Sequence, residues 1–380
     1  MGGAAGHIKQ IWEATEVPFG DLRKLVYNSL EGTLENVSEK LDGQNILITY
    51  KDGKALCART IEQVRNFGEQ AMNIEFTRIY FAQRGNPYSV QRTFVNAVKD
   101  FDSLFNESSV KFKKVFEEGK YWLNVEILSV DTENIIPYFK DQLCIHHLIE
   151  YDENGKKIQI IDLEFTAKQM ETFLICKTNK VTMGCIDRGL RNELMSYFES
   201  LINGFNDEET IGDFMEYKME EYIEENINDE QLLINSLALR WGKGIKDPNI
   251  TSLLKYTSYE TSVWVREEDK NIKEKYDEIL HPFVFFFSKL GVIILKHLGG
   301  LVTRSKEVAV SNLSEKLHDA IANVSSVGLE KHLVLLNELG INNSVVPTEG
   351  IVFEFDDQLY KLTGSFTPIL RIIGTHRFGA

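Results

Sequence analysis

Alternating apolar and polar positions predict two β-hairpins near opposite ends of the chain. Residues 45–50 and 55–58 are apolar, β-rich runs on either side of Asp52-Gly53, and Asp-Gly in that position is a strong turn signal. Residues 349–355 and 359–363 form a second such pair. Further strands are predicted at 121–130, 142–151 and 157–163.

Apolar residues spaced three and four apart predict helices at 21–36 and 90–118. Between about 166 and 342 the pattern is almost wholly helical, with periodic segments at 190–205, 214–227, 231–241, 272–298 and 313–339. So long a helical stretch between strands is not an ordinary connection. The sequence therefore predicts an α+β protein in three parts: a core beginning at 1–165, a helical insertion at 166–342, and the rest of the core at 343–380.

Lys40 is the residue with the clearest chemical signal. It precedes Asp42 and Gly43 at fixed offsets, between two β-rich segments. Lysine is the side chain whose pKa falls most readily on desolvation, which suits an amine that attacks phosphorus. Gly43 is expected to let the backbone approach a nucleotide closely. The alternative from these residues alone is an exposed turn with a solvated lysine.

With the segment 39–45 (Glu-Lys-Leu-Asp-Gly-Gln-Asn), Arg59, Glu126, Glu349 and Lys361 in chain order, the sequence resembles the covalent nucleotidyltransferase superfamily of ATP-dependent polynucleotide ligases and RNA-capping enzymes. It looks most like phage RNA ligases of the second type, and is also similar to ligase-like proteins of large tailed phages. The resemblance implies an antiparallel-sheet nucleotidyltransferase core, the adenylation core of ligases, interrupted here by the helical insertion.

The resemblance also implies a role for each matching residue. Lys40 accepts AMP from ATP, and Lys361 stabilises the α-phosphate. Glu349 and Glu126 are the expected ligands of Mg²⁺ or Mn²⁺. The residues expected to bind the nucleotide are Glu39, Asp42, Gly43, Asn45, Arg59, Glu126 and Lys361. The chain departs from the family at Thr363, where a second lysine normally follows Lys361.

The expected function is that of an ATP-dependent polynucleotide ligase acting through lysyl-AMP, in a role such as RNA repair. Fewer than twenty residues follow Lys361, too few for the oligonucleotide-binding barrel of DNA ligases and capping enzymes. RNA is therefore favoured over DNA as the substrate. Two alternatives stay open: a GTP-dependent capping-type transferase, and a ligase-like fold without activity that serves as a phage structural or interaction protein.

The net charge of −15 is unevenly distributed. Residues 207–230 hold eleven acidic residues and one lysine, so this segment is expected to face away from a bound strand or to meet a basic protein partner of the insertion. Residues 78–120 combine cations with aromatic residues: Arg78, Arg84, Arg92, Lys99, Lys111, Lys113, Lys114 and Lys120 with Tyr80, Phe81 and Tyr88. This segment is a candidate strand-binding surface, with a solvated charged face as the alternative.

Cysteine and hydropathy patterns indicate the compartment. Four cysteines without paired spacing, and no secretory leader, predict reduced thiols in the cytoplasm, the host's if the gene is a phage's. The apolar run 283–295 contains Ser288 and Lys289 and is too short to span a bilayer, so a buried helix and no membrane association are expected. Cys144 and His146 are expected on one face of a strand, without a metal.

Overall fold

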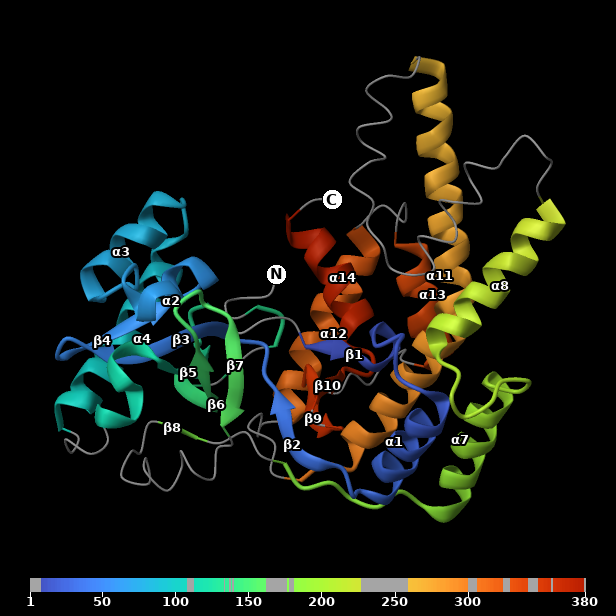
Figure 1. The fold of residues 1–380 in the computed structure, drawn as a ribbon, viewed down its shortest axis with the longest axis horizontal. Helices are drawn as coiled ribbons and strands as arrows, with labels where there is room; N and C mark the ends of the chain where they lie inside the picture. Colours follow the sequence, from blue (N-terminus) through green and yellow to red (C-terminus); the bar gives the residue numbers. More distant parts are fainter. Residues whose placement is uncertain are drawn as a thin grey trace.

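The computed structural model describes residues 8–107, 113–132, 134–136, 138, 140–161, 176–177, 181–226, 259–299, 306–323, 329–340, 348–356 and 358–378. The predicted helix at 231–241 and the predicted surface residue Lys111 lie outside this part of the chain. The protein is a mixed α and β structure in which helices surround two mainly antiparallel sheets (Figure 1).

The first sheet has four strands in the order β1-β10-β9-β2. Their bounds are β1 Lys9–Gln10, β10 Gln358–Leu362, β9 Gly350–Phe355 and β2 Glu35–Lys40. All pairs are antiparallel except β1 with β10. The predicted hairpin near the end of the chain is thus confirmed as β9 and β10, and β2 joins it from the opposite end of the sequence.

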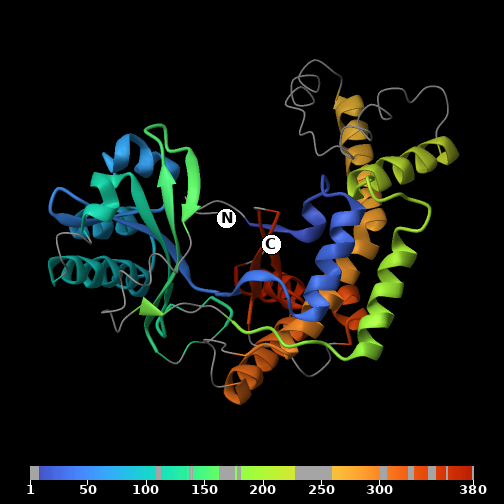
Figure 2. The ribbon, with the colours of Figure 1, turned by 60° about the horizontal axis from the view of Figure 1, so that its bottom comes forward.

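The second sheet has six strands, five of them in the order β4-β3-β5-β6-β7, with β8 beside β6. The bounds are β3 Gln44–Lys51, β4 Lys54–Ala58, β5 Tyr121–Leu128, β6 Gln142–Tyr151, β7 Lys157–Ile161 and β8 Cys176–Lys177. The β3–β4 turn is the predicted one, since Asp52 and Gly53 both have positive φ, 51° and 78°. Figures 1 and 2 show β2 leaving the first sheet and entering the second as β3.

The helices are α1 Phe19–Glu31, α2 Ile61–Gly68, α3 Ile74–Gln83, α4 Tyr88–Glu107, α7 Arg188–Leu201, α8 Ile211–Asn226, α11 Tyr259–Lys296, α12 Lys306–Asn323, α13 Glu330–Glu338 and α14 Phe366–Phe378, with 3-10 turns η1 Ile11–Glu13 and η2 Lys114–Gly119. Two predicted helix ends are wrong. The helix predicted to reach residue 36 stops at Glu31, because Gly32 takes the left-handed conformation that ends helices. The helix predicted to reach 118 does not do so, because Lys114–Gly119 is a 3-10 turn in which Glu117 and Glu118 have positive φ.

The face of the six-stranded sheet that carries Ile46, Ile48 and Val125 is covered by α3 and α4, which contribute Phe81, Phe94, Val98 and Phe101 to a buried cluster. The other face packs α2 through Val64 against Trp122 and Ile149. These contacts hold the sheet and its three helices together as one lobe, on the left of Figure 1.

The predicted helical insertion shares hydrophobic clusters with both flanking parts of the chain. Phe198 of α7 and Phe283, Phe286 and Phe287 of α11 are fully buried together with α1 and with Ile351 and Phe353 of β9. A further cluster joins α12, α13 and α14 to Leu41, Leu128 and Tyr138. The helices of 166–342 therefore pack on the strands that surround Lys40.

Within the described residues, one stretch, Glu274–Lys296 of α11, is long and apolar enough to cross a membrane, with a mean hydropathy of 1.7. Half of its most apolar window is buried inside the protein. Phe283, Phe286, Phe287 and Leu290 are fully buried in the shared cluster, as expected of the predicted buried helix. Packing against α1 and β9 accounts for the apolar character of this helix.

Candidate functional site

Lys40 and Glu349 form an ion pair where the four-stranded sheet meets the connection to the second sheet. Lys40 is the last residue of β2 and lies opposite Gly350 of β9, so Glu349 is brought beside it. The Lys40 Nζ to Glu349 Oε1 distance is 2.5 Å, and the two side chains are only 25% and 15% exposed. The structure thus joins two residues that were predicted to act together from opposite ends of the sequence.

The pKa of Lys40 is the net result of opposing effects. Burial lowers it, as the sequence led us to expect, but the charge and hydrogen bond of Glu349, with the charges of Glu126 and Asp42, outweigh burial and raise the pKa above its ordinary value. Burial also raises the pKa of Glu349, against the lowering effect of Lys40. The acidic neighbours of Lys40 therefore favour its charged form, and burial opposes them.

Leu41, Asp42 and Gly43 carry the chain from one sheet to the other. A Cβ at Gly43 would lie 2.6 Å from the Ile127 carbonyl oxygen and 2.9 Å from Cγ of Glu126. No side chain fits at that distance, so glycine is required for the turn to reach β5. Gly43 thus allows a close approach to β5 and Glu126, and the approach of a nucleotide stays a prediction.

Asp42 binds the connection between β5 and β6. Its Oδ2 accepts hydrogen bonds from the backbone N–H groups of Ile135, at 2.7 Å, and Ile136, at 2.9 Å. Its own N–H donates to the Tyr138 hydroxyl at 2.8 Å. Asn134 Nδ2 adds a 2.9 Å bond to the Gly43 carbonyl. The carboxylate predicted to bind nucleotide therefore fixes a protein segment beside Lys40.

Burial raises the pKa of Asp42 to about 7, and the negative charge of Glu349 raises it in the same direction. The two backbone N–H groups and Lys40 oppose this shift without cancelling it. The side chain is 7% exposed. Asp42 therefore changes its charge near neutral pH while bound to the β5–β6 connection.

Asn45, Glu126 and Arg59 form a polar group on the six-stranded sheet. Asn45 Nδ2 donates to Asn124 Oδ1 at 2.7 Å and to Glu126 Oε2 at 3.2 Å. The Arg59 guanidinium donates to the Asn45 carbonyl and lies 5.1 Å from the centre of the Phe94 ring. Burial lowers the pKa of Arg59, and the charge of Glu126 opposes that shift. Three residues predicted to bind the nucleotide thus lie together, and their binding of a nucleotide stays a prediction.

His146 and His147 were not predicted to belong to the site. The β5–β6 register pairs Val125 with Ile145 but Asn124 with His147, so His146 is an extra residue in a β-bulge. The His146 Nε2 atom lies 3.4 Å from Glu126 Oε2, and His147 Nε2 lies 3.2 Å from Asn124 Nδ2. The strict alternation expected for this strand is therefore wrong. Adjacent histidines in a strand were the one sequence signal.

His147 is a neutral member of this group. Burial, together with the neighbouring charges of His146 and Lys157, lowers its pKa to about 3. A neutral imidazole has one donor and one acceptor nitrogen, so His147 and Asn124 form a hydrogen bond without a net charge. The bulge thus supplies a neutral polar group next to Asn124.

Lys361 lies in β10, and Thr363 directly follows the end of that strand. Burial and the charge of Lys40 lower the pKa of Lys361, while Glu13 and Glu349 oppose them. Thr363 is buried and accepts a 2.8 Å hydrogen bond from Gln10 Nε2, and its hydroxyl lies 2.8 Å from that of Thr367. A neutral hydrogen-bonded network therefore occupies the position where the family has its second lysine.

Glu39 lies opposite Ile351 in the β2–β9 pair, one residue before Lys40, and its side chain is 1% exposed. Because side chains alternate along a strand, it lies on the face of β2 opposite to that of Lys40. Its negative charge contributes to the raised pKa of Tyr138. The structure thus places Glu39 under the turn rather than beside the amine.

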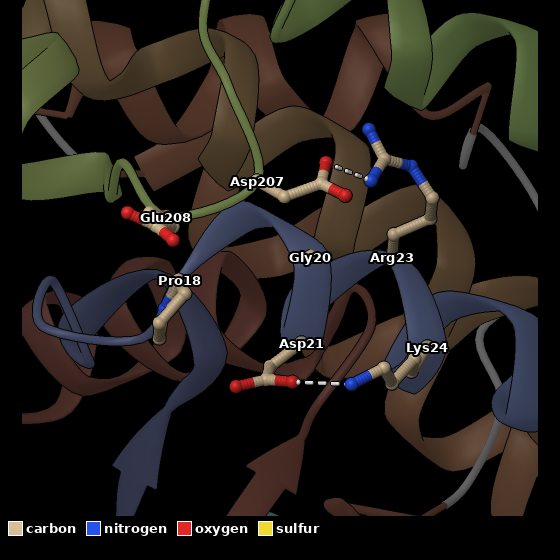
Figure 3. Close-up of a pocket in the computed structure, with 7 residues that line it drawn as sticks. All are labelled: Pro18, Gly20, Asp21, Arg23, Lys24, Asp207 and Glu208. Atoms are coloured by element: carbon tan, nitrogen blue, oxygen red, sulfur yellow. Dashed lines mark hydrogen bonds and ion pairs between the residues drawn. The ribbon is translucent and has the colours of Figure 1, made fainter.

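A cavity of about 460 Å³ lies elsewhere, between the start of α1 and residues 207–208 (Figure 3). Arg23 pairs with Asp207 at 2.5 Å, and Lys24 with Asp21 at 2.9 Å, across and beside this opening. The N–H of Gly20 donates to the Asp207 carbonyl. Glu208 also lines the cavity, and none of the residues predicted for catalysis does.

Metal binding was tested on the side chains present. Within the part of the chain that the structure describes, no group of three or more His, Cys, Asp or Glu side chains is placed to hold a metal ion. Mg²⁺ is commonly bound by one or two carboxylates together with substrate phosphates. Glu349 and Glu126 both act on Lys40 electrostatically and fit that kind of site.

Comparison with known proteins gives no relative. No protein-family model matches the chain, and neither a curated protein nor a solved structure does. The function must therefore be inferred from the residues and their geometry.

Proposed function

We propose that this protein is an ATP-dependent polynucleotide ligase that forms a covalent lysyl-AMP intermediate at Lys40. The observation that carries the proposal is the 2.5 Å contact between Lys40 and Glu349, at the junction of two sheets and within the charges of Asp42, Glu126 and Lys361. A buried lysine beside a carboxylate and a second cation is the arrangement required for an amine that attacks a phosphate.

The first step follows from that contact. The ammonium of Lys40 has no lone pair, so it must lose a proton, and the Glu349 oxygen in contact with it is the acceptor. Burial raises the pKa of Glu349 and makes it a stronger base than an exposed carboxylate. The Lys40 nitrogen then bonds to the α-phosphorus of ATP as the bond to pyrophosphate breaks. Lys361, on the same sheet, stabilises negative charge on the phosphates.

Mg²⁺ held by Glu349 and Glu126 would neutralise charge on the triphosphate and on the leaving group. Asn45 and Arg59 orient the Glu126 region through the bonds described above. In later steps AMP passes to a 5′-phosphate, and a 3′-hydroxyl displaces it to seal the strand. RNA is the proposed strand, on the resemblance to phage RNA ligases.

The test is the mass of the intact protein after incubation with Mg²⁺ and either ATP or GTP. We expect one acid-labile AMP on the parent protein and none on Lys40→Ala. The matched control is Lys54→Ala, which removes an exposed lysine from the neighbouring hairpin and should still label. An adduct with GMP alone would favour a capping-type transferase. No adduct with either nucleotide, on protein first stripped of bound nucleotide, would favour a fold without this activity.

A further inference from the structure

The α3–α4 region contains a continuous series of cation and ring contacts that begins at the candidate site. The Arg59 guanidinium lies 5.1 Å from the centre of the Phe94 ring, and Phe94 stacks on Phe81 at 4.1 Å. Phe81 meets the edge of Tyr80 at 5.1 Å, and the Arg84 guanidinium lies 4.2 Å from the Tyr80 ring centre. The series thus connects a guanidinium beside Asn45 to one at the protein surface.

Arg84 differs from three other cations of the predicted strand-binding surface, which are paired with acidic side chains. Arg78 pairs with Glu75 at 3.1 Å, Arg92 pairs with Asp131, and Lys120 lies 3.0 Å from Glu150. For Arg84, no ion pair with an acidic side chain is found among the described residues, and the residue is exposed. Its positive charge also acts on Arg59, so the two guanidinium groups lie close enough to repel each other.

Two neighbouring guanidinium groups, one of them without a carboxylate partner, form an anion-binding surface. Stacking on Tyr80 holds the Arg84 plane in place, leaving its edge N–H groups available to a phosphate oxygen. Tyr88, 75% exposed at the start of α4, follows closely in the chain and adds an exposed ring. Single-stranded nucleic acids are bound by just this combination of cations along the backbone and aromatic rings for the bases.

We propose that Arg84, held on Tyr80, binds a backbone phosphate of the single strand that is to be joined. The site rests on the proposed function only in naming that strand as the substrate. The strand then runs along the α3–α4 surface toward Arg59 and Lys40. Phe81, which the sequence placed on the same surface, is buried and supports the two rings beside it instead of meeting the strand.

The experiment measures binding of a 5′-phosphorylated, 3′-fluorescein-labelled RNA strand by fluorescence anisotropy, without ATP and at several salt concentrations. We expect Arg84→Gln to weaken binding about fivefold at 0.1 M salt and to reduce the salt slope by about 0.7, the values for one phosphate contact to a single strand. Arg78→Gln, on the helix that Arg84 caps but paired with Glu75, is the matched control and should stay within about twofold of the parent.

The binding measurement is repeated with a DNA strand of the same sequence. Three results would overturn the site: an Arg84→Gln protein that binds as the parent does, equal losses of affinity in both variants, or a loss of affinity for RNA but not for DNA. The last result would assign the contact to the 2′-hydroxyl. Labelling of Lys40 is measured separately on the parent protein. Missing label with Arg84-dependent binding would refute the ligase reaction alone, whereas label with Arg84-independent binding would refute the strand site alone.

Discussion

Replacing Asp42 by asparagine tests whether the buried carboxylate governs stability near neutral pH. The side chain oxygen of asparagine can still accept the N–H groups of Ile135 and Ile136, while the ionisation is removed. The folded pKa of Asp42 is about 7, against an ordinary value of 3.8. Because the folded pKa is raised, the folded state prefers the proton more than the unfolded chain does.

The sign and size of the effect on the unfolding free energy follow from the difference between the folded and ordinary pKa of Asp42. The favourable contribution of protonated Asp42 is complete below pH 3.8 and is lost as the pH rises to about 7, after which it stays constant. Between pH 5 and pH 8 the parent should lose roughly 2–3 kcal/mol of unfolding free energy through this group, at about 1.4 kcal/mol per unit of pKa. Asp42→Asn lacks that loss.

The assay is urea unfolding of both proteins at intervals from pH 5 to pH 8. The unfolding free energy of Asp42→Asn minus that of the parent should rise by roughly 2–3 kcal/mol across this range. Asp52→Asn, at the exposed β3–β4 turn, is the control for the loss of one acidic side chain. A flat difference for Asp42→Asn would refute the reasoning, since it would mean that Asp42 ionises equally in the folded and unfolded chains.

Other substitutions test the geometry around the amine. Gly43→Ala should cost about 1–3 kcal/mol of stability and abolish nucleotide labelling, because its Cβ would lie 2.6 Å from the Ile127 carbonyl oxygen. Chemical unfolding measures the stability and intact mass measures the labelling, and normal labelling would contradict the close approach. Glu349→Gln and Lys361→Ala should each slow labelling about a hundredfold to a thousandfold, and single-turnover rates near that of the parent would refute their roles. Replacing residues 170–340 by a Gly/Ser linker should leave no folded core, as measured by circular dichroism. Each buried large apolar side chain contributes about 1.5–3 kcal/mol, and several are lost together. A folded core that still labels would show that the shared clusters are dispensable.

Local pattern was sufficient for the hairpins. The turn at Asp52-Gly53 needs two residues that tolerate positive φ, and the residue types Asp and Gly therefore predict the turn directly from the sequence. The pairing of β9 with β10 follows in the same way from alternating apolar residues around a short polar turn. Such features depend on neighbours in the chain, so a single sequence contains all that is needed.

The partners of individual polar groups could not be predicted in this way. Asp42 binds Ile135 and Ile136 across more than ninety residues, and apolar periodicity says nothing about such a pair. The bulge at His146 was equally hidden, because an extra residue in one strand shows itself only against the register of its neighbour. The close approach of Gly43 to the Ile127 carbonyl oxygen was hidden for the same reason.

The pKa of the proposed nucleophile depends both on burial, which the sequence indicated, and on charged partners that only the fold brings close. The sequence indicated a desolvated amine with a lowered pKa, and burial does act on Lys40 in that direction. Glu349, Glu126 and Asp42 outweigh burial and raise the pKa of Lys40, whose Nζ lies 2.5 Å from Glu349 Oε1. If Glu349 takes the proton or is engaged elsewhere, the largest opposing charge is lost, and burial with the nearby charge of Lys361 then favours the neutral amine. Control of Lys40 therefore resides in Glu349, a residue at the far end of the sequence that the β2–β9 pairing brings within contact.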